Sequence, residues 1–468
     1  MSNPTSDPNR FPSQARFIVG NEAAERFSYY GLVSILMVYI TDVLEKSEDR
    51  GTMIIHGFKF VNYFMPLLGG WISDRFLGRY RTILWISLAY CAGHATLALG
   101  DFAGTMGGRT ACLYTGLALI AFGSGGIKPC VSAFLGDQFG PHQGHLLRKA
   151  YAAFYWAINF GSFFSMALIP QIKEKSWAWA FGVPGIFMGI ATLIFWLGRH
   201  RYVKVPPARV SKRAGFFAVL FAALSNRGQS PGGFWSGALR KYSPEEVDAA
   251  RSLGPILSIF LFIPFFWSLF DQTHTTWVSQ GKQMIPVTLL FGWRLDAASI
   301  QAINPLLVMG LVPLLTLGLY PFLGRLATPL RRMCAGFFLA GSSFLIVAWL
   351  QSRIQGGEQL SILWQMVPYL VLTVGEVLLS TTGLEFAFRE AAPSMKSTIM
   401  AFWNLTVAMG NLLVMGITHF MATGQDHSSA VTPGRFLMYG LLTLSVATIF
   451  SLICACYRYR DAEAAQGR

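Results

Sequence analysis

The sequence predicts an all-α membrane protein with twelve transmembrane helices in two six-helix bundles. Of the 468 residues, 53% are hydrophobic and only 13% are charged, whereas soluble domains carry about 25% charged residues. Apolar runs of about 20 residues, the length that crosses a bilayer, recur along the whole chain. The second half of the chain also repeats features of the first half at a constant offset.

The apolar runs define the expected spans and the expected domains. The twelve spans are 17–41, 53–73, 81–100, 110–136, 147–170, 179–200, 252–272, 299–320, 333–351, 361–388, 394–422 and 435–457. The apolar stretch 214–225 is too short to span and is expected to lie at the surface between the halves. The expected order is a polar tail (1–16) without the pattern of a cleavable signal peptide, a bundle (17–200), a basic linker with an interfacial helix (201–251), a second bundle (252–457) and a tail (458–468).

The distribution of Lys and Arg predicts the orientation. With the N-terminus inside, about 25 basic residues fall in cytoplasmic segments and about 9 in outer segments, so both termini are expected in the cytoplasm. The net charge of +14 therefore reflects orientation, and no nucleic-acid partner is expected. The six cysteines lie in apolar runs without metal-ligand or disulfide spacing, so they are interpreted as small buried hydrophobes, and no metal site is expected.

A sequence repeat supports the two-bundle arrangement. The segment RFLGRYRTI (75–83) is echoed by PFLGRLATPLRR (321–332), with Gly78 and Gly324 246 positions apart. The same offset carries Glu25 to Asp271. A duplicated six-helix unit with polar residues at matching depths is how many secondary transporters build a site at the middle of the membrane.

Eight ionisable side chains fall within the expected spans. They are Glu22, Glu25, Arg26, His56, Lys59, Lys128, Asp271 and Glu376. A charge at the centre of a bilayer costs about 3 kcal/mol on insertion scales, so these side chains must face one another or a watered cavity. The alternative is that these groups only form a static ion pair that locks two helices together. Such a lock needs a single pair, whereas the chain places eight ionisable groups in five spans.

Three of these groups share one face of the first span. Glu22 and Arg26 are four positions apart, and Glu22 and Glu25 are three apart. Two carboxylates beside one guanidinium leave a surplus acid. Such an acid can take a proton from one side of the membrane and release it to the other.

Eight segments in order resemble motifs of the proton-dependent oligopeptide transporter family of the major facilitator superfamily. They are EAAERFSYYG (22–31), GGWISDRFLGRYRTI (69–83), GSGGIKPCVSAFLGDQF (123–139), FYWAINFGSF (154–163), FWSLFDQTHTTW (266–277), AINPLL (302–307), GEVLLSTTGLEFAF (375–388) and MKSTIMAFWNLTVAMGN (395–411). The resemblance implies a major facilitator fold and a proton-coupled symporter that imports di- and tripeptides by alternating access. It also implies a monomer in the bilayer, with protons as the coupling ion and no cofactor.

The resemblance assigns roles to matching residues. It implies proton coupling by Glu22, Glu25 and Arg26, and an ion-pair gate between Lys128 and Asp271. Glu376 and Asn159 match groups that meet the amino end of a peptide. The positions that match the lining of the substrate cavity are Tyr29, Tyr30, Tyr63, Asn304 and Trp403. A zwitterionic peptide needs an acid at one end and bases at the other, between aromatic walls that tolerate many side chains.

The sequence departs from the family pattern near the first span. Val33 stands where peptide carriers usually have a basic residue, which removes a cation expected near the substrate carboxylate and Asp271. Lys59 lies one turn outward of Tyr63 and either restores that charge in the substrate site or snorkels to the outer interface. His56 matches a histidine of the animal branch and suits proton entry. The chain lacks both the large insert of animal members and the two extra helices of many bacterial ones. A compact bacterial member in the cytoplasmic membrane is therefore expected.

Two other functional classes compete with peptide transport. The same fold carries nitrate or another small anionic or amino-acid-like solute in plant relatives, although Glu376 would repel a bare anion. A multi-pass enzyme or a nutrient receptor is the second rival. The spans contain no nucleophile–base pair, metal cluster or HExxH motif, so no catalytic residue is expected.

Overall fold

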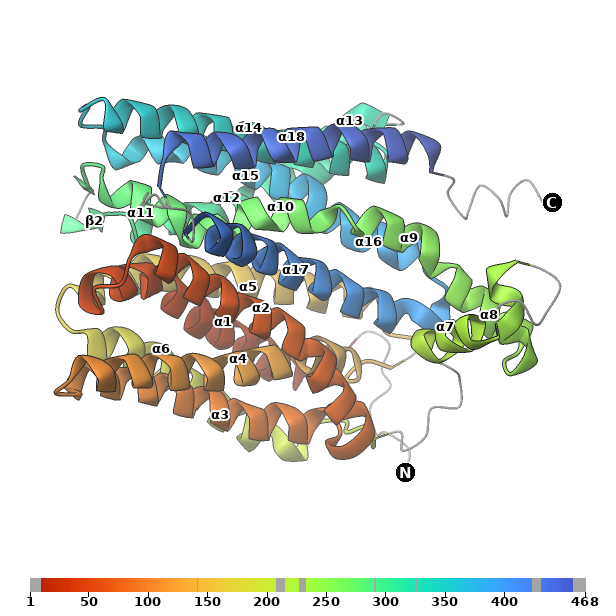
Figure 1. The fold of residues 1–468 in the computed structure, drawn as a ribbon. Helices are drawn as coiled ribbons and strands as arrows, with labels where there is room; N and C mark the ends of the chain where they lie inside the picture. Colours follow the sequence, from red (N-terminus) through yellow and green to blue (C-terminus); the bar gives the residue numbers. More distant parts are fainter. Residues whose placement is uncertain are drawn as a thin grey trace.

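The computed structural model describes residues 10–140, 142–207, 215–226, 233–289, 292–324, 327–422 and 431–457. The tail expected at 458–468 and most of the one expected at 1–16 lie outside these residues. The described chain is almost entirely helical (Figure 1).

The first six spans form the N-half. Its helices are α1 (Ala15–Val38) with the π-turn η1 (Tyr39–Val43), α2 (Glu48–Ile72) with η2 (Ser73–Leu77), α3 (Arg79–Leu99) with η3 (Gly100–Phe102), α4 (Met106–Gly136), α5 (Gly144–Lys173), and α6 (Trp177–Leu197) with η4 (Gly198–His200).

A short connection leads to the C-half. The connection contains α7 (Phe216–Ser225) and η5 (Phe234–Arg240). The C-half consists of α8 (Pro244–Arg251), α9 (Leu253–Phe260), α10 (Ile263–Phe270), η6 (Asp271–His274), α11 (Thr276–Lys282), β1 (Val287–Thr288), β2 (Arg294–Leu295), η8 (Ser299–Ala302), α12 (Ile303–Pro313), η9 (Leu314–Leu319), α13 (Tyr320–Leu323), α14 (Pro329–Gln355), η11 (Ile362–Gln365), α15 (Met366–Glu376), η12 (Val377–Thr381), α16 (Thr382–Glu390), η13 (Pro393–Met395), α17 (Lys396–Ala422) and α18 (Pro433–Cys456).

The helix lengths agree with the predicted fold. Among the described residues, nine helices are long and apolar enough to cross a membrane, and a bent pair of helices makes a tenth span. Helices α1 and α2 are 24 and 25 residues long and carry several of the ionisable side chains noted above. With these two added, the described helices are consistent with the twelve spans that the sequence predicts.

The seventh span differs from its predicted bounds of 252–272. It runs from Pro244, inside the predicted linker, to Lys282, and its two parts meet at an angle of 45°. The helix begins early because Ser243 and Glu246 form a capping box at its start. The bend follows from Pro264 in the first turn of α10, since proline cannot continue the backbone hydrogen bonds of the preceding helix.

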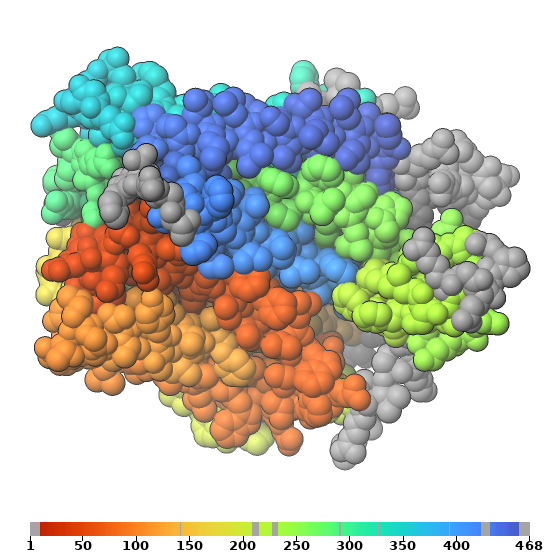
Figure 2. Space-filling model, in the orientation of Figure 1, coloured from red at the N-terminus to blue at the C-terminus, as the bar shows by residue number. Residues whose placement is uncertain are grey.

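The two halves pack side by side along their length (Figures 1 and 2). One hydrophobic core lies in α1–α6 and a second one in α7–α18. Helices α7 and α8 and the last turn of α18 lie at one end of the molecule, here called the linker end. The antiparallel hairpin β1–β2, which the sequence did not predict, lies at the opposite end, here called the hairpin end. Val278, Ala297 and Ala298 of the C-half join the core of the N-half.

Close helix crossings depend on small residues. A β-carbon at Gly69 of α2 would collide with the backbone of Gly126 in α4, and one at Gly161 of α5 would collide with the backbone of Ala23 in α1. Small residues of this kind let helix backbones approach closely inside a membrane. They hold α2, α4 and α5 around α1, the helix that carries the acidic cluster.

Candidate functional site

Helix α1 carries a buried cluster of two carboxylates and one guanidinium. The Nε of Arg26 lies 3.0 Å from Oε1 of Glu22, and its Nη2 forms an ion pair with Glu25. Ser124 of α4 donates its hydroxyl proton to Oε1 of Glu25 at 2.6 Å. All three ionisable side chains are buried. With one cation for two acids, the cluster becomes neutral when one carboxyl group takes up a proton.

A second polar cluster joins the two halves. The Nζ of Lys59 donates to Oδ1 of Asp271 at 2.6 Å, and Nδ2 of Asn411 donates to Oδ2 of Asp271 at 2.6 Å. The ring of His56 has Nδ1 2.8 Å from Oδ1 of Asn411 and Nε2 3.1 Å from Oγ1 of Thr275. We call these five residues the interhalf cluster.

The hydrogen bonds of this cluster show that Nδ1 of His56 carries a hydrogen atom. The side-chain nitrogen of Asn411 donates a hydrogen bond to Asp271. Its side-chain oxygen therefore faces His56 and accepts a hydrogen bond from Nδ1–H. The other ring nitrogen, Nε2, has the hydroxyl group of Thr275 as its partner. The ring therefore has a hydrogen-bond partner at both nitrogens. Because His56 comes from α2 and its partners from the C-half, this bonding closes the seam between the halves.

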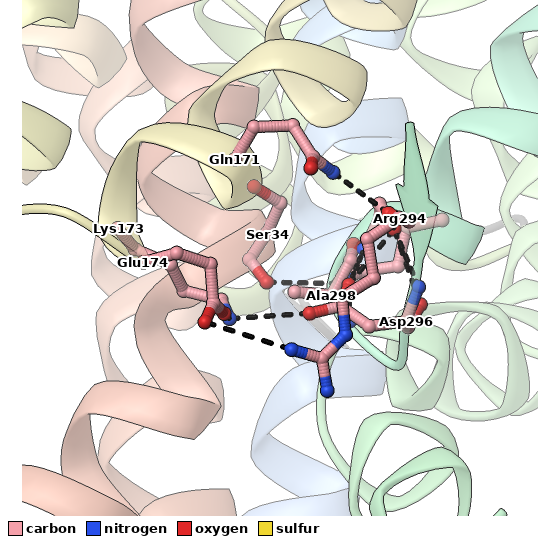
Figure 3. A network of polar contacts seen from close by, with 9 residues as sticks. Ser34, Gln171, Lys173, Glu174, Arg294, Asp296 and Ala298 are labelled. Carbon is pink, nitrogen blue, oxygen red and sulfur yellow. Dashed lines mark hydrogen bonds and ion pairs between the residues drawn. The ribbon is translucent and has the colours of Figure 1, made fainter. Parts of the chain in front are cut away.

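Ion pairs at the rim of the hairpin end also connect the halves. The Nζ of Lys173, at the end of α5, lies 2.6 Å from Oε1 of Glu174 and 3.1 Å from Oδ2 of Asp296 in the C-half (Figure 3). Gln171 donates to the backbone oxygen of Arg294 at 2.7 Å, and the guanidinium of Arg294 lies 3.8 Å from Glu174.

Two further rim pairs lie on other helices. Lys282 of α11 pairs with Asp42 of η1, and Arg435 of α18 lies 2.5 Å from Asp49 of α2. Each pair joins one half to the other. The hairpin end is therefore closed both at its rim and in its interior.

A cavity of about 130 Å³ lies between the halves. Its lining residues are Tyr30, Tyr155, Ile158, Asn159, Ser162, Met166, Phe270, Thr273, His274, Gln301, Asn304, Pro305, Tyr369, Glu376 and Ser380. Asn304 donates from Nδ2 to Oε2 of Glu376 at 2.7 Å, which orients the carboxylate. Asn159, on the wall formed by α5, donates to the backbone oxygen of Tyr155 at 3.0 Å. The cavity thus has one acid on the C-half and amide and phenol groups on both halves.

The family of this chain follows from its similarity to known proteins. A family model described as "POT family" matches residues 80–433, which is most of the chain. The chain belongs to the POT family. This confirms the resemblance to the proton-dependent oligopeptide transporters that the motifs indicate.

Solved structures and curated relatives agree with this assignment. The structure of the POT family transporter PepTSo is 38% identical, covers 96% of this chain and 99% of its own, and has a TM-score of 0.86. An auto-inhibited POT family peptide transporter is 38% identical, covers 96% of this chain and 98% of its own, with a TM-score of 0.84. These matches confirm the predicted major facilitator fold.

Two animal proteins show the same similarity over part of their length. "Peptide transporter family 1" of Drosophila melanogaster is 36% identical over 74% of this chain and 49% of its own length. Human "Solute carrier family 15 member 2" is 35% identical over 75% of this chain and 50% of its own length. The chain therefore spans about half the length of these curated relatives.

The POT family chain brings two groups of predicted residues together. Glu22, Glu25 and Arg26 form the acidic cluster of α1, as their spacing predicts. Four predicted substrate residues line the cavity, namely Tyr30, Asn159, Asn304 and Glu376. Their roles in proton coupling and substrate binding remain predictions.

The expected ion pair between Lys128 and Asp271 is wrong for this conformation. The Nζ of Lys128 lies over the rings of Tyr29 and Tyr63, 4.6 and 4.2 Å from their centres, and has no hydrogen-bond partner among the described residues. Asp271 pairs with Lys59 instead. The reason is helix packing, because α4 packs against α1, α2 and α3, whereas α2 packs directly on α17 of the C-half.

Lys59 therefore neither snorkels nor lines the cavity. Its side chain is 2% exposed and its charge is neutralised inside the interhalf cluster. Of the other predicted lining residues, Tyr29 stacks on Phe58 and Tyr63 lies under Lys128. Trp403 packs edge-on against Phe260, 5.4 Å between ring centres. None of these three aromatic residues lines the cavity.

Several polar residues of the site were missed from the sequence. Asn411 completes the interhalf cluster, and His274 and Gln301 line the cavity. A signal for His274 was available, because it is the fourth residue of DQTHTTW, three residues after Asp271, and ionisable groups in spans are rare. Asn411 and Gln301 are uncharged, so the same argument does not find them.

Proposed function

We propose that this chain is a proton-coupled symporter that imports di- and tripeptides by alternating access. The observation that carries the proposal is the half-buried Glu376–Asn304 pair in a cavity between the two halves. An oriented carboxylate in such a place suits the ammonium group of a peptide. Two of the related proteins described above are named as peptide transporters, which supports the same cargo. Membership of the POT family classifies the chain as a transporter and not as an enzyme.

The closed hairpin end supports alternating access. The interhalf cluster and the rim pairs hold this end shut, and a cavity of about 130 Å³ is smaller than the roughly 300–1,000 Å³ of typical ligand pockets. The halves must therefore move relative to one another to admit and release a peptide. The two bundles, N-half and C-half, are proposed as the rigid units of that motion.

The acidic cluster of α1 supports proton coupling. It lies in the N-half, where the guanidinium of Arg26 is 5.9 Å from the ring centre of Tyr29, and the next residue, Tyr30, lines the cavity. Protonation of its surplus carboxyl group releases Arg26 from one of its two partners, so proton binding can change the contacts of α1. The proton is the only coupling ion in this proposal, and no cofactor takes part.

The linker end is proposed to face the cytoplasm, and the excess of basic residues in the segments expected on that side supports this orientation. The chain would then be a multi-pass protein of a bacterial cytoplasmic membrane, with both termini inside, working as a monomer. In that orientation the structure is closed to the outside. The His56 ring would become accessible to outside protons only when the interhalf cluster opens.

Replacing Glu376 with alanine is expected to weaken dialanine binding by at least 100-fold. The change removes the only carboxylate that lines the described cavity, and losing one partner of a charged pair that the bound peptide would enclose typically costs about 3–5 kcal/mol. N-acetyldialanine should bind poorly to the unaltered protein, because acetylation removes the ammonium group. Competition against labelled dialanine measures both effects, with the exposed Glu358→Gln as control. Equal affinity for free and acetylated peptide would refute this role.

Replacing Lys173 with alanine is expected to reduce dialanine uptake by less than threefold. The side chain of Lys173 is only 8% exposed, but one of its two partners, Glu174, is 45% exposed, and an ion pair with an exposed partner contributes about 0–1 kcal/mol. The two other rim pairs also remain. The initial rate of uptake into proteoliposomes measures this, and Lys175→Ala removes the same charge from an exposed neighbour as a control. A complete loss of uptake would show that the rim pair, and not the interhalf cluster, controls the closed end.

A counterflow assay separates the competing functions. Proteoliposomes are loaded with unlabelled dialanine and diluted into a trace of labelled dialanine. Parallel vesicles are loaded with nitrate or with alanine, and each is diluted into a trace of the same solute in labelled form. A peptide carrier accumulates label only in the dialanine-loaded vesicles. Exchange of nitrate or of alanine alone would assign another cargo to the same fold, and no exchange of any solute would favour a receptor.

A further inference from the structure

His274 occupies a position between the interhalf cluster and the cavity. It ends η6, three residues after Asp271, and it is 5% exposed. Its ring lines the cavity, with the ring centre of Tyr30 from the N-half at 6.4 Å. Nothing in the acidic cluster or the interhalf cluster requires a histidine here.

The neighbouring glutamine orients the histidine ring. The Nε2 of Gln301 donates to the backbone oxygens of Ser34 and Ala298, at 2.9 and 3.0 Å. Its Oε1 must therefore face the ring, and it lies 2.5 Å from Nδ1 of His274. An amide oxygen only accepts, so Nδ1 carries the hydrogen atom and Nε2 carries a lone pair. We find no partner of Nε2 in the described part of the chain, so Nε2 is the nitrogen available to a ligand.

The cavity wall lacks a permanent cation. None of its lining residues is Lys or Arg, and Val33 stands where a basic residue was expected. Lys59 is neutralised by Asp271, and Arg26 is held by two carboxylates. Lys128 lies over the rings of Tyr29 and Tyr63 and is not one of the residues that line the cavity. A peptide carboxylate beside the lone pair of neutral His274 would be repelled. It is attracted once Nε2 carries a proton, because Nε2 then donates a charge-assisted hydrogen bond.

Charged and titratable groups surround His274 on several elements. Asp271 lies on its own element, Glu376 lies across the cavity, and Lys59 of α2 pairs with Asp271. His56 is hydrogen-bonded at both ring nitrogens, and Tyr30, Tyr155 and Tyr369 contribute phenol groups to the wall. An arriving carboxylate adds a negative charge next to the ring and therefore favours uptake of a proton at that moment.

We propose that His274 binds the carboxylate end of the transported peptide through protonated Nε2, so that peptide binding takes up one proton from water at this ring. This rests on the proposed peptide symport and adds a second protonation site to the cluster of α1. His274 is a specificity-determining residue, because its protonated ring replaces the missing cation at the carboxylate end of the peptide. Its partner Gln301 contacts Ser34 of α1, so the bound carboxylate would also hold the N-half against the C-half near the closed end.

The test measures affinity and proton uptake together on the purified full chain. Dialanine and its C-terminal amide are titrated against the unaltered protein, His274→Gln and His274→Asn, with tryptophan fluorescence as the binding signal. Protons taken up on saturation with dialanine are counted with a pH-sensitive dye in weakly buffered solution at about pH 7. Monodisperse elution and an unchanged unfolding midpoint show that each variant is folded.

We expect the unaltered protein to bind the amide at least tenfold more weakly than dialanine. Each variant should bind dialanine at least tenfold more weakly, distinguish it from the amide by less than threefold, and take up about one proton fewer per peptide. If the variants keep the full discrimination and the same proton count, the assignment of His274 is wrong and Arg26 or Lys128 holds the carboxylate. If the unaltered protein does not bind dialanine at all, the proposed peptide transport fails instead.

Discussion

Replacing Glu22 or Glu25 with glutamine is expected to abolish uptake of dialanine driven by a proton gradient. Both side chains are buried and share Arg26, so the surplus carboxyl group is the group of α1 that can gain and lose a proton. Glutamine keeps the size and the hydrogen-bonding capacity of the side chain but cannot release a proton. The initial rate of uptake into proteoliposomes with an acidic exterior is expected to fall at least 100-fold in each variant.

Counterflow separates a loss of coupling from a loss of folding. Exchange of labelled for unlabelled dialanine needs no net proton movement, so at least one of the two variants should keep it. Glu358→Gln, which changes an exposed carboxylate paired with Arg353, serves as the matched control and should leave both activities unchanged. Gradient-driven accumulation that persists in both Glu22→Gln and Glu25→Gln would show that proton coupling lies elsewhere.

Replacing Lys59 with alanine is expected to disrupt closure of the hairpin end and to reduce dialanine uptake at least tenfold. The substitution leaves Asp271 buried at 4% exposure without its cation, and breaking a buried pair in this way typically costs about 3–5 kcal/mol. The closed conformation alone carries this cost, so the protein should shift towards the conformation that is open at the hairpin end. Labelling of a cysteine introduced at Ala298, a buried residue of the C-half that packs into the core of the N-half, should become faster.

A second substitution tests whether the pair itself is responsible. Lys59→Ala combined with Asp271→Asn removes both charges and should bring the labelling rate back towards that of the unaltered protein. Lys59→Ala combined with Val33→Arg should recover part of the uptake, because it returns a cation to the position that the family pattern uses. Lys175→Ala controls for loss of a positive charge near the same end. Normal transport by Lys59→Ala alone would show that the pair is not needed for the cycle.

Hydropathy and spacing predicted most of this fold. The twelve spans, the short helix at 216–225 and the clustering of Glu22, Glu25 and Arg26 depend on local patterns, which the sequence displays directly. The hairpin β1–β2 was missed because its strands have two residues each, too few for an alternating pattern. The bend in the seventh span depends on how α10 packs, although Pro264 marks its place.

The sequence did not predict which distant charged residues pair with one another, and this was the main gap in the predicted site. Lys59 and Lys128 are both cations in apolar helices, and the sequence does not show which of them faces the C-half. That choice depends on the packing of α2 against α17, which brings Lys59 to Asp271 and leaves Lys128 between Tyr29 and Tyr63. The same limit explains why Asn411 was missed, since an uncharged amide in a span gives no signal until its partners are known.

Accumulation of dialanine under a controlled proton gradient tests proton-coupled peptide transport most directly. The unaltered protein is reconstituted into vesicles at neutral internal pH and diluted into medium at about pH 6 with labelled dialanine, with and without a protonophore. We predict that labelled peptide rises above its external concentration and then returns to it when the protonophore is added. Uptake that stops at the external concentration with or without the gradient, in vesicles that still perform dialanine counterflow, would contradict proton coupling.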